Sequence, residues 1–378
     1  MIRPEDLVAW LTSEGVSLYC GVPDSLLKDF NACVSGPMPE AVHMTAANEG
    51  NAVGLAIGHY LSAGAPALVY LQNSGLGNTV NPLTSLADPE IYGIPMILLV
   101  GWRGQPGVAD EPQHRKLGRI MPELLDSLGL PWSVLPQETD PAAAAVRKAV
   151  SRSMAMSTPY VFLVAKGTFG PAWSAARSPA DGLPSREDAL IALAGALGGD
   201  RVVVSSTGML SRELAEYRER TGTCSGLDFL TVGGMGHASS IALGIALRET
   251  REVWCLDGDG SLLMHLGALP VAARHAPQTF FHVVFNNGVH DSVGGQPTSI
   301  DCIDVPTLAK SCGYRYASSV SSLGALVDEL AVLRERGGPA LLEIRVSPGS
   351  RSDLGRPRAT PAESKAAVME ALRGRAAS

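Results

Sequence analysis

The second half of the sequence carries an acidic, glycine-rich turn that could bind a phosphate and a metal ion. The apolar run 252–257 leads directly into Gly258-Asp259-Gly260-Ser261. Glycines let a backbone approach a phosphate closely, and a helix beginning at Ser261 would offer free N–H groups. Asp259, at the end of the predicted strand, can place a hard carboxylate oxygen on Mg²⁺. The same four residues could also form an ordinary strand-to-helix turn, because Asp and Gly are common turn formers.

A second polar segment supplies the remaining ligands for such a site. The predicted strand 280–286 ends in Asn286-Asn287-Gly288, and Asn287 lies 28 residues after Asp259. The amide oxygen of Asn287 and the carbonyl oxygen of Val289 can join Asp259 on one ion, with two diphosphate oxygens and a water completing an octahedron. The combination predicts a magnesium–diphosphate site.

A third glycine-rich stretch, 233–237, precedes an alanine-rich segment. It fails the spacing of a dinucleotide fingerprint, and no acid closes a following strand at the required place. A nucleotide-sugar or NAD enzyme of doubly wound fold therefore remains only an alternative, which extraction of the cofactor would test.

Short, continuous apolar runs alternate with helical stretches along both halves, as expected for parallel strands buried on both faces. Strands are predicted at 17–22, 41–46, 67–72, 95–102, 132–135, 160–165, 201–205, 252–257, 280–286, 314–317 and 340–346, and helices at 4–13, 48–62, 141–156, 212–220, 238–248, 261–275, 305–312, 323–336 and 361–372. The pattern predicts an α/β protein with two doubly wound parallel-sheet domains, whose ligands bind at the carboxyl ends of the strands.

The predicted domains are 1–170 and 186–378, joined by a linker at 171–185 that is rich in Gly, Pro, Ser and Ala. Ser185 and Asp188 have the spacing of a capping box, and Gly198-Gly199 would end the helix that follows.

Composition excludes several classes of function. The 378 residues carry a net charge of −7, which argues against a nucleic-acid partner but leaves room for a local basic pocket. The longest apolar runs are too short to span a bilayer, and the first residues do not form a signal peptide. Six scattered cysteines without a CxxC pair predict reduced, mostly buried thiols, no structural zinc site and a cytoplasmic location.

The spacing of the GDG and NN segments is the signature of thiamine diphosphate enzymes, and longer stretches resemble the phosphonopyruvate decarboxylase family, which is close to the sulfopyruvate decarboxylases. These stretches are GVPDSLL (21–27), NEGNAVG (48–54), QNSGLGNTVNPLTSL (72–86), GWRGQPGVADEPQH (101–114), GMGHASSIALGIAL (234–247), NNGVHDSVGGQPT (286–298) and GSRSDLGRP (349–357). The resemblance covers nearly the whole chain. It implies a pyrimidine-binding domain followed by a diphosphate-binding domain, and the short linker leaves no room for the third domain of many relatives.

The resemblance also implies a set of cofactor residues. They are Glu49, Thr207, Gly208, Gly234, Met235, Gly258, Asp259, Gly260, Ser261, Asn287 and Val289, with Asp259, Asn287 and Val289 holding the metal. Met235 would support the bent shape of the cofactor, although a tight turn with a core methionine would have the same sequence.

Glu49 is the residue that the resemblance assigns to activation of the cofactor. In this family a buried glutamate pairs with N1′ of the aminopyrimidine, and Glu49 is the only acid between Glu40 and Asp88. Burial among small apolar residues should raise its pKa. By itself, the position could equally reflect the ordinary preference of Glu for a helix N-terminus.

The implied reaction converts phosphonopyruvate to phosphonoacetaldehyde and CO₂, a step of phosphonate biosynthesis. A phosphonate needs cations and hydrogen-bond donors; the candidates are Ser25, Lys28, Asn73, Asn78, Arg103, His114, Arg351 and Arg356. Arg103 and His114 rank first, because WRG closes a strand and DEPQH follows in a predicted active-site loop. His290 and His237 are candidates for proton relay. Each of these side chains could instead be a solvated surface group or a structural histidine.

The resemblance implies at least a homodimer, with active sites between subunits and a small anionic 2-keto acid as substrate. Sulfopyruvate is the alternative substrate, and a single chain holding both domains favours the phosphonate, because sulfopyruvate enzymes are often split into two subunits. Further alternatives are decarboxylation of another small 2-keto acid and carboligation onto a second aldehyde. The chain could also be a non-catalytic subunit that binds the cofactor.

Overall fold

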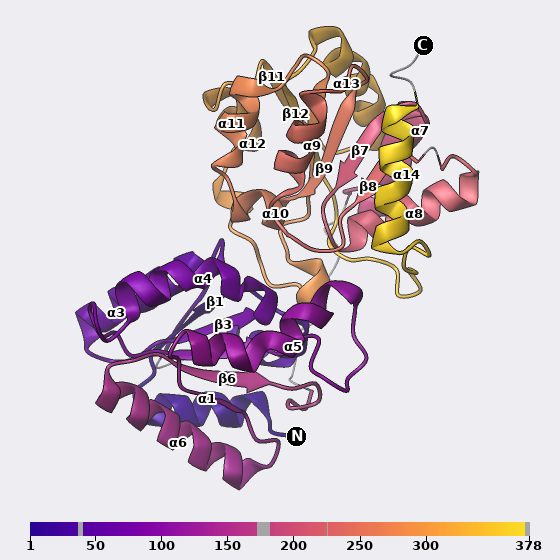
Figure 1. Ribbon diagram of the computed structural model, residues 1–378. Helices are drawn as coiled ribbons and strands as arrows, with labels where there is room; N and C mark the ends of the chain where they lie inside the picture. The colour runs from indigo at the N-terminus through magenta and orange to yellow at the C-terminus, as the bar shows by residue number, and fades with distance from the viewer. Residues whose placement is uncertain (37–40, 172–181, 225, 375–378) are drawn as a thin grey trace. The chain divides into compact units, whose positions relative to one another are not determined.

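The computed structural model describes residues 1–36, 41–171, 182–224 and 226–374 (Figure 1). The chain divides into two compact units, 1–177 and 178–378. Most of the predicted linker, residues 172–181, lies outside the described residues. Within the described part of the chain, no helix combines the length and apolar character needed to cross a membrane.

A six-stranded parallel sheet forms the centre of the first unit, and its strands follow the order β2-β1-β3-β4-β6-β5. The strands are β1 (Leu18–Gly21), β2 (Val42–Thr45), β3 (Leu68–Gln72), β4 (Ile97–Gly101), β5 (Trp132–Val134) and β6 (Tyr160–Val164). All six coincide with predicted strands. β4 and β6 are buried along their whole length, which explains their unbroken apolar sequences.

Helices cover both faces of this sheet (Figure 1). α1 (Pro4–Ser13), α2 (Lys28–Val34) and α6 (Thr139–Met156) pack on one face, and α3 (Glu49–Ala63), α4 (Leu76–Pro82) and α5 (Pro112–Ser127) pack on the other. The Asn48 side chain caps α3 by accepting from the Asn51 amide at 2.9 Å, and Gly64 ends the helix at φ 65°. Sequence analysis did not predict α2, α4 or α5.

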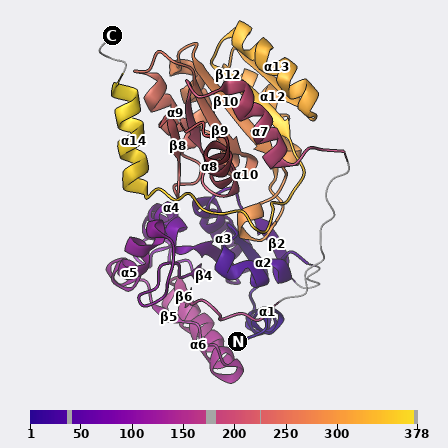
Figure 2. The same ribbon diagram turned by 90° about the vertical axis from the view of Figure 1, so that its right-hand side faces the viewer.

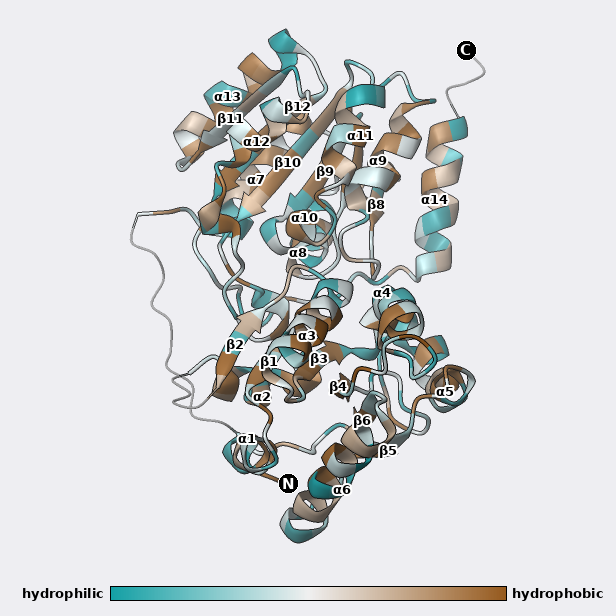
Figure 3. Ribbon diagram, turned by 90° about the vertical axis from the view of Figure 1, so that its left-hand side faces the viewer, coloured by the Kyte–Doolittle hydropathy of each residue, from teal (hydrophilic) through white to brown (hydrophobic). Residues whose placement is uncertain are grey.

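The second unit repeats the same strand order in a second parallel sheet, β11-β12-β10-β9-β7-β8. Its strands are β7 (Val202–Ser205), β8 (Asp228–Leu230), β9 (Val253–Gly258), β10 (Phe280–Asn286), β11 (Tyr316–Val320) and β12 (Ala340–Arg345). Hydrophobic colouring appears on the strands and on parts of the helices that cover them (Figure 3). The edge strand β8 was not predicted, because its three residues are only half buried and give no apolar run.

α7 (Arg186–Leu197), α8 (Met209–Thr221) and α13 (Leu323–Arg336) cover one face of the second sheet. α9 (Ala238–Ala246), α10 (Asp259–Met264), α11 (Ala268–His275) and α12 (Val305–Ser311) cover the other. α14 (Pro361–Arg373) packs against β8 (Figure 2). Ser185 caps α7 as predicted, because its hydroxyl accepts from the Asp188 amide at 3.0 Å, but the second half of the predicted capping box is not seen; Gly198 ends the helix.

Two predictions of local structure are wrong. The helix predicted over 261–275 begins at Asp259 and is interrupted at 265–267, where His265 leaves helical geometry at φ −138° and ψ 54°. The cysteines are all unpaired, but only Cys20 and Cys255 are buried, while Cys224 and Cys302 are exposed. The exposed cysteines lie in connections, where an apolar neighbour in sequence does not imply burial.

Candidate active site

Glu49 is a buried carboxyl at the carboxyl edge of the first sheet. It is the first residue of α3, directly after β2, and is only 5% exposed. Asn78 donates from Nδ2 to Glu49 Oε2 at 2.7 Å. Burial raises the pKa of Glu49 above its ordinary value, although the Asn78 hydrogen bond opposes the shift. The predicted direction of the pKa shift is therefore confirmed.

Gly75 leaves the space that the Glu49 carboxyl occupies. A Cβ on Gly75 would lie 2.1 Å from Glu49 Oε1, far inside contact distance. The glycine has an ordinary helical backbone, at φ −80° and ψ −9°. The requirement for glycine therefore comes from the side chain it faces and not from its own conformation.

Arg103 follows β4 and lies with two other predicted substrate residues. Its Nη1 donates to Ser25 Oγ at 2.6 Å, and its carbonyl oxygen accepts from Asn73 Nδ2 at 2.8 Å. The guanidinium also donates from Nε and Nη2 to both oxygens of Asp110. The structure thus brings Ser25, Asn73 and Arg103 together, but it shows a carboxylate partner of Arg103 that sequence analysis missed.

His114 and Lys28, two other predicted residues of the first unit, differ in position and burial. His114 lies in the first turn of α5 and not in the predicted loop, because Pro112 begins a helix there. Burial, together with the nearby Arg103, lowers the pKa of His114, so its imidazole is neutral at pH 7. Lys28 is exposed at the start of α2.

Asp24 is a buried acid in this cluster that sequence analysis did not single out. It is fully buried, accepts from Gln72 Nε2 at 2.6 Å and from the Leu26 amide at 3.1 Å, and burial raises its pKa. A Cβ on Gly101 would lie 2.0 Å from its Oδ2. The quoted stretch GVPDSLL contains Asp24, but nothing local in the sequence indicates its burial.

The second unit contains a cavity of about 100 Å³ at the carboxyl ends of β7, β9 and β10. Nine predicted site residues line it: Thr207, Met235, Gly258, Asp259, Gly260, Ser261, Asn287, Val289 and His290. The remaining two cofactor candidates of this unit, Gly208 and Gly234, do not line it and have positive φ, at 109° and 68°. A Cβ on Gly258 would meet no atom within 4 Å. The turn therefore leaves open space beside Gly258.

Asp259 and Asn287 meet at this cavity from neighbouring strands. The Asp259 carboxylate is 2% exposed and accepts from Thr298 Oγ1 at 2.5 Å, and also from the backbone amides of Gly260 and Asn287. Burial raises its pKa to about 6. Asn287 Oδ1 accepts from the Val289 amide at 3.1 Å. Carboxylate, amide and carbonyl oxygens in one place are the ligand types that Mg²⁺ prefers, so this site fits that ion.

Ser261 lies within a helix and is not, as predicted, its first residue. The helix begins two residues earlier, and Ser261 Oγ accepts from the Gly236 amide at 3.0 Å. This hydrogen bond joins the two glycine-rich turns that sequence analysis found separately.

Three histidines lie near these turns. The His290 ring packs on Gly260, where a Cβ would lie 2.8 Å from Cε1, and burial lowers the pKa of His290 to about 4. His237 is exposed and its ring centroid lies 4.6 Å from that of His265. His290 therefore lines the cavity as a neutral imidazole, whereas His237 does not line it.

The arginines predicted in the last segment lie outside the cavity. Arg351 pairs with Glu187, Glu216 and Asp353. Arg356 lines a separate cavity of about 530 Å³ beside α8 and α14. The contacts of Arg351 indicate that it fastens the segment after β12 to α7 and α8.

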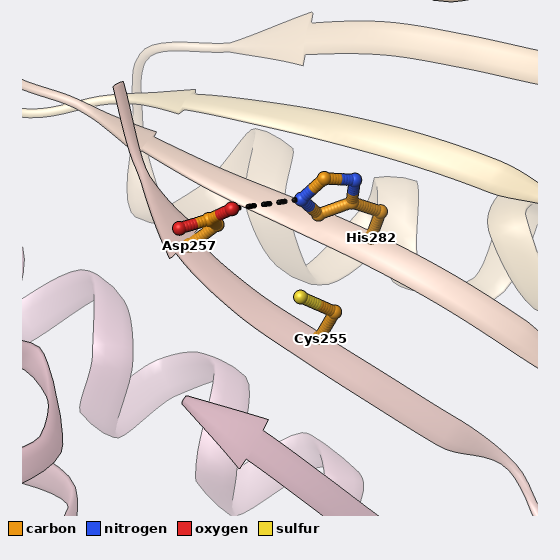
Figure 4. Close-up of side chains that lie close together, drawn as sticks. All are labelled: Cys255, Asp257 and His282. Atoms are coloured by element: carbon orange, nitrogen blue, oxygen red, sulfur yellow. Dashed lines mark ion pairs between the residues drawn. The ribbon is translucent and has the colours of Figure 1, made fainter. Parts of the chain in front are cut away.

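Beneath the Gly258 turn, Cys255, Asp257 and His282 form a buried polar group (Figure 4). Their potential ligand atoms lie within 4.8 Å of one another, and these residue types also occur in transition-metal sites. Here, however, Nδ1 of His282 lies 3.3 Å from the Tyr314 hydroxyl, and Nε2, which makes no hydrogen bond, lies 3.4 Å from Asp257 Oδ2. We interpret the group as a polar contact that fixes the end of β9 against β10.

Comparison with known proteins identifies the family of this chain. Residues 4–122 match the model of the thiamine pyrophosphate enzyme N-terminal TPP binding domain, and residues 203–344 match that of the C-terminal TPP binding domain. Thiamine pyrophosphate is another name for thiamine diphosphate. The chain therefore belongs to the thiamine pyrophosphate enzymes.

The full-length relatives narrow the family. The chain is 40% identical to a phosphonopyruvate decarboxylase of Streptomyces viridochromogenes, covering 96% of this chain and 93% of the relative. It is 38% identical to one of Streptomyces hygroscopicus, covering 96% and 92%. It is 30% identical to a sulfopyruvate decarboxylase of Methanosarcina acetivorans, covering 93% of each. The chain belongs to the group that contains these decarboxylases.

The contact between Gly75 and Glu49 predicts the effect of one added methyl group. Gly75→Ala should displace the Glu49 carboxyl and lower turnover at least tenfold, because the Cβ would occupy the position of Oε1. The control is Gly58→Ala, on the exposed side of α3, where a Cβ meets nothing within 4 Å. Steady-state kinetics of both variants tests this, and equal activity of the two would contradict it.

The raised pKa of Glu49 predicts a pH-dependent cost in stability. Its ionised form is disfavoured in the folded protein, so wild-type stability falls as pH rises through the raised pKa. Without cofactor, Glu49→Gln should therefore melt a few degrees above wild type at pH 8. The difference should vanish as pH falls to the ordinary glutamate value of 4.5. Thermal melts across this pH range test the prediction, and a Glu49→Gln variant less stable than wild type at pH 8 would contradict it.

Proposed function

We propose that this chain catalyses decarboxylation of phosphonopyruvate to phosphonoacetaldehyde and CO₂, using thiamine diphosphate and Mg²⁺. The observation that carries the proposal is the similarity over 96% of the chain to two phosphonopyruvate decarboxylases, at 40% and 38% identity. The single-chain sulfopyruvate decarboxylase is only 30% identical, although it also spans both domains. The presence of both domains in one chain is therefore not an argument for phosphonopyruvate as the substrate. The argument is the higher sequence identity to the phosphonopyruvate decarboxylases.

In this proposal each unit has its own set of cofactor residues. Thiamine diphosphate supplies the electron sink for loss of the carboxylate. Asp259, Asn287 and the Val289 carbonyl would hold Mg²⁺, with Thr207, Gly208 and the Gly258–Ser261 turn around the diphosphate. Met235 and Gly234 would support the thiazolium and pyrimidine rings. Glu49 would hold a proton at N1′, and its burial supports that role because the raised pKa favours sharing a proton.

His290 and His114 are the groups we propose for handling protons near the substrate. Both have lowered pKa values, so each can accept a proton as a neutral imidazole at pH 7. Arg103, Ser25 and Asn73 are the phosphonate contacts best supported, because they lie together at the carboxyl ends of β1, β3 and β4. Lys28, Arg351 and Arg356 are weaker candidates.

The proposal also includes a homo-oligomer with active sites between subunits. It further includes a cytoplasmic location and a role in phosphonate biosynthesis. The absence of disulfides among the six cysteines supports a reducing compartment.

Aldehyde formation from phosphonopyruvate, sulfopyruvate and pyruvate, measured side by side with thiamine diphosphate and Mg²⁺, tests the function. We expect at least a tenfold preference for phosphonopyruvate in kcat/KM and loss of activity with EDTA. A preference for sulfopyruvate would overturn the substrate and keep the cofactor chemistry. Activity that survives EDTA, after dialysis of the protein, would contradict the metal dependence.

Arg103→Lys and Arg351→Lys form a matched pair that tests the phosphonate contact. Lysine keeps the charge but cannot reproduce the forked contacts of arginine. Arg103→Lys should raise KM for phosphonopyruvate at least tenfold and leave thiamine diphosphate affinity unchanged, whereas Arg351→Lys should change KM less than twofold. Equal effects of the two substitutions on KM would show that Arg103 has no special role.

A further inference from the structure

Asn287 is an amide, so its value as a metal ligand depends on which way it faces. Only the oxygen of the amide can bind Mg²⁺, whereas the nitrogen can only donate hydrogen bonds. A free asparagine could present either atom to the cavity. Something in the structure must therefore determine its orientation.

Asp291 is the side chain that contacts this amide. Asn287 donates from Nδ2 to Asp291 Oδ2 at 2.7 Å. An ionised carboxylate accepts hydrogen bonds and cannot donate them, so the nitrogen of Asn287 must face Asp291. The amide oxygen then faces the other way, where it already accepts from the Val289 amide at 3.1 Å. Val289 supplies the carbonyl that is the third proposed metal ligand.

Asp291 is itself held by a buried arginine. Arg186, the first residue of α7, is 7% exposed and donates from Nη1 to Asp291 Oδ2 at 2.7 Å. Its Nε and Nη2 donate to the two oxygens of Glu213 at 3.0 and 2.9 Å. The Gly349 amide donates to Asp291 from the far side, at 3.2 Å to Oδ1 and 3.1 Å to Oδ2. Asn287, Arg186 and Gly349 thus all donate to one carboxylate, and Glu213 holds Arg186 in place.

This arrangement belongs to the cavity and not to the general core. Arg186 and Asp291 line the same cavity as Asp259, Asn287 and Val289. We propose that Asp291, anchored by Arg186 and Glu213, is a positioning residue that holds the amide oxygen of Asn287 toward the metal ion. The inference rests on the proposed function, because it takes Asn287 as a ligand.

The fold provides a close control for a test of this proposal. Arg218 and Asp228 form a second buried ion pair in the same unit, with Nε and Oδ2 2.8 Å apart and side chains 3% and 11% exposed. The Arg186–Asp291 pair is similar, at 2.7 Å, 7% and 13%. Neither Arg218 nor Asp228 lines the metal cavity. An effect that comes only from weakening a buried ion pair should therefore appear when either pair is altered.

The experiment compares Asp291→Asn with Asp228→Asn. Mn²⁺ serves as the probe of the metal site, and its affinity in the presence of thiamine diphosphate is measured by electron paramagnetic resonance of the free ion. Loss of a carboxylate that orients a metal ligand typically costs about 10–100-fold in affinity. We expect Asp291→Asn to weaken Mn²⁺ binding within that range, and Asp228→Asn to change it less than twofold while lowering Tm by a comparable amount.

The Mg²⁺ dependence of activity provides a second test, because a purely structural role of Asp291 would not change it. In Asp291→Asn, the Mg²⁺ concentration for half-maximal activity should rise at least tenfold, and kcat should recover at saturating Mg²⁺. Should Asp291→Asn fold poorly, Arg186→Lys tests the same contact, because one ammonium group cannot span both Asp291 and Glu213. It should weaken Mn²⁺ binding at least threefold.

Two results would overturn the proposal: Mn²⁺ affinity within twofold of wild type in folded Asp291→Asn or Arg186→Lys, or equal losses in Asp291→Asn and Asp228→Asn. Failure of the wild-type protein to bind Mn²⁺ with thiamine diphosphate is a different outcome. It would overturn the proposed metal site and, with it, the role of Asp291.

Discussion

The constraint on which this structure depends is the burial of two parallel sheets on both faces. Strands such as β4 and β6 have almost no exposed surface, and their residues are apolar along nearly their whole length. Polar groups that must meet a ligand are confined to the connections, and in doubly wound sheets the connections at the carboxyl ends form the binding edge. Glu49 and Asp259 both lie at such an edge, each at the first position of a helix.

The repeated strand order extends this constraint to both units. In each parallel sheet the second strand is added on one side of the first strand and the third strand on the other side. The strand order therefore switches between β1 and β3 and between β7 and β9. Glu49 follows the second strand of the first unit, as Met235 follows the second strand, β8, of the other. One topology thus places an acid in one unit and a glycine-rich cradle in the other, at corresponding positions of the fold.

Much of this could be predicted from sequence, because the signals are local. Continuous apolar runs predicted the first unit's six strands, and glycines with Asp259 and Asn287 at strand ends predicted part of the cavity lining, whereas Arg186, Asp291 and Ser292 were missed. The raised pKa of Glu49 followed from its small apolar neighbours. The exact start of α10 could not be predicted, since Gly258-Asp259-Gly260 reads as a turn until the amides of Gly260 and Asn287 converge on the Asp259 carboxylate.

The pairings between distant segments could not be predicted at all. The contact of Arg103 with Asp110 crosses a loop, and that of Arg186 with Asp291 joins residues 105 positions apart. Neither leaves a periodic signal in the sequence. These pairings matter for function because they decide which charges are free to meet a substrate and which orient another ligand.

We propose that Glu49 activates bound thiamine diphosphate. The most direct test is the exchange of the C2 proton of bound thiamine diphosphate for deuterium, followed by quenched-flow NMR in wild type and Glu49→Gln. The account predicts that Glu49→Gln binds the cofactor within about threefold of wild type and slows this exchange by about 10²–10⁴-fold, the usual range for loss of an acid–base group. Exchange at the wild-type rate in Glu49→Gln with bound cofactor would contradict it.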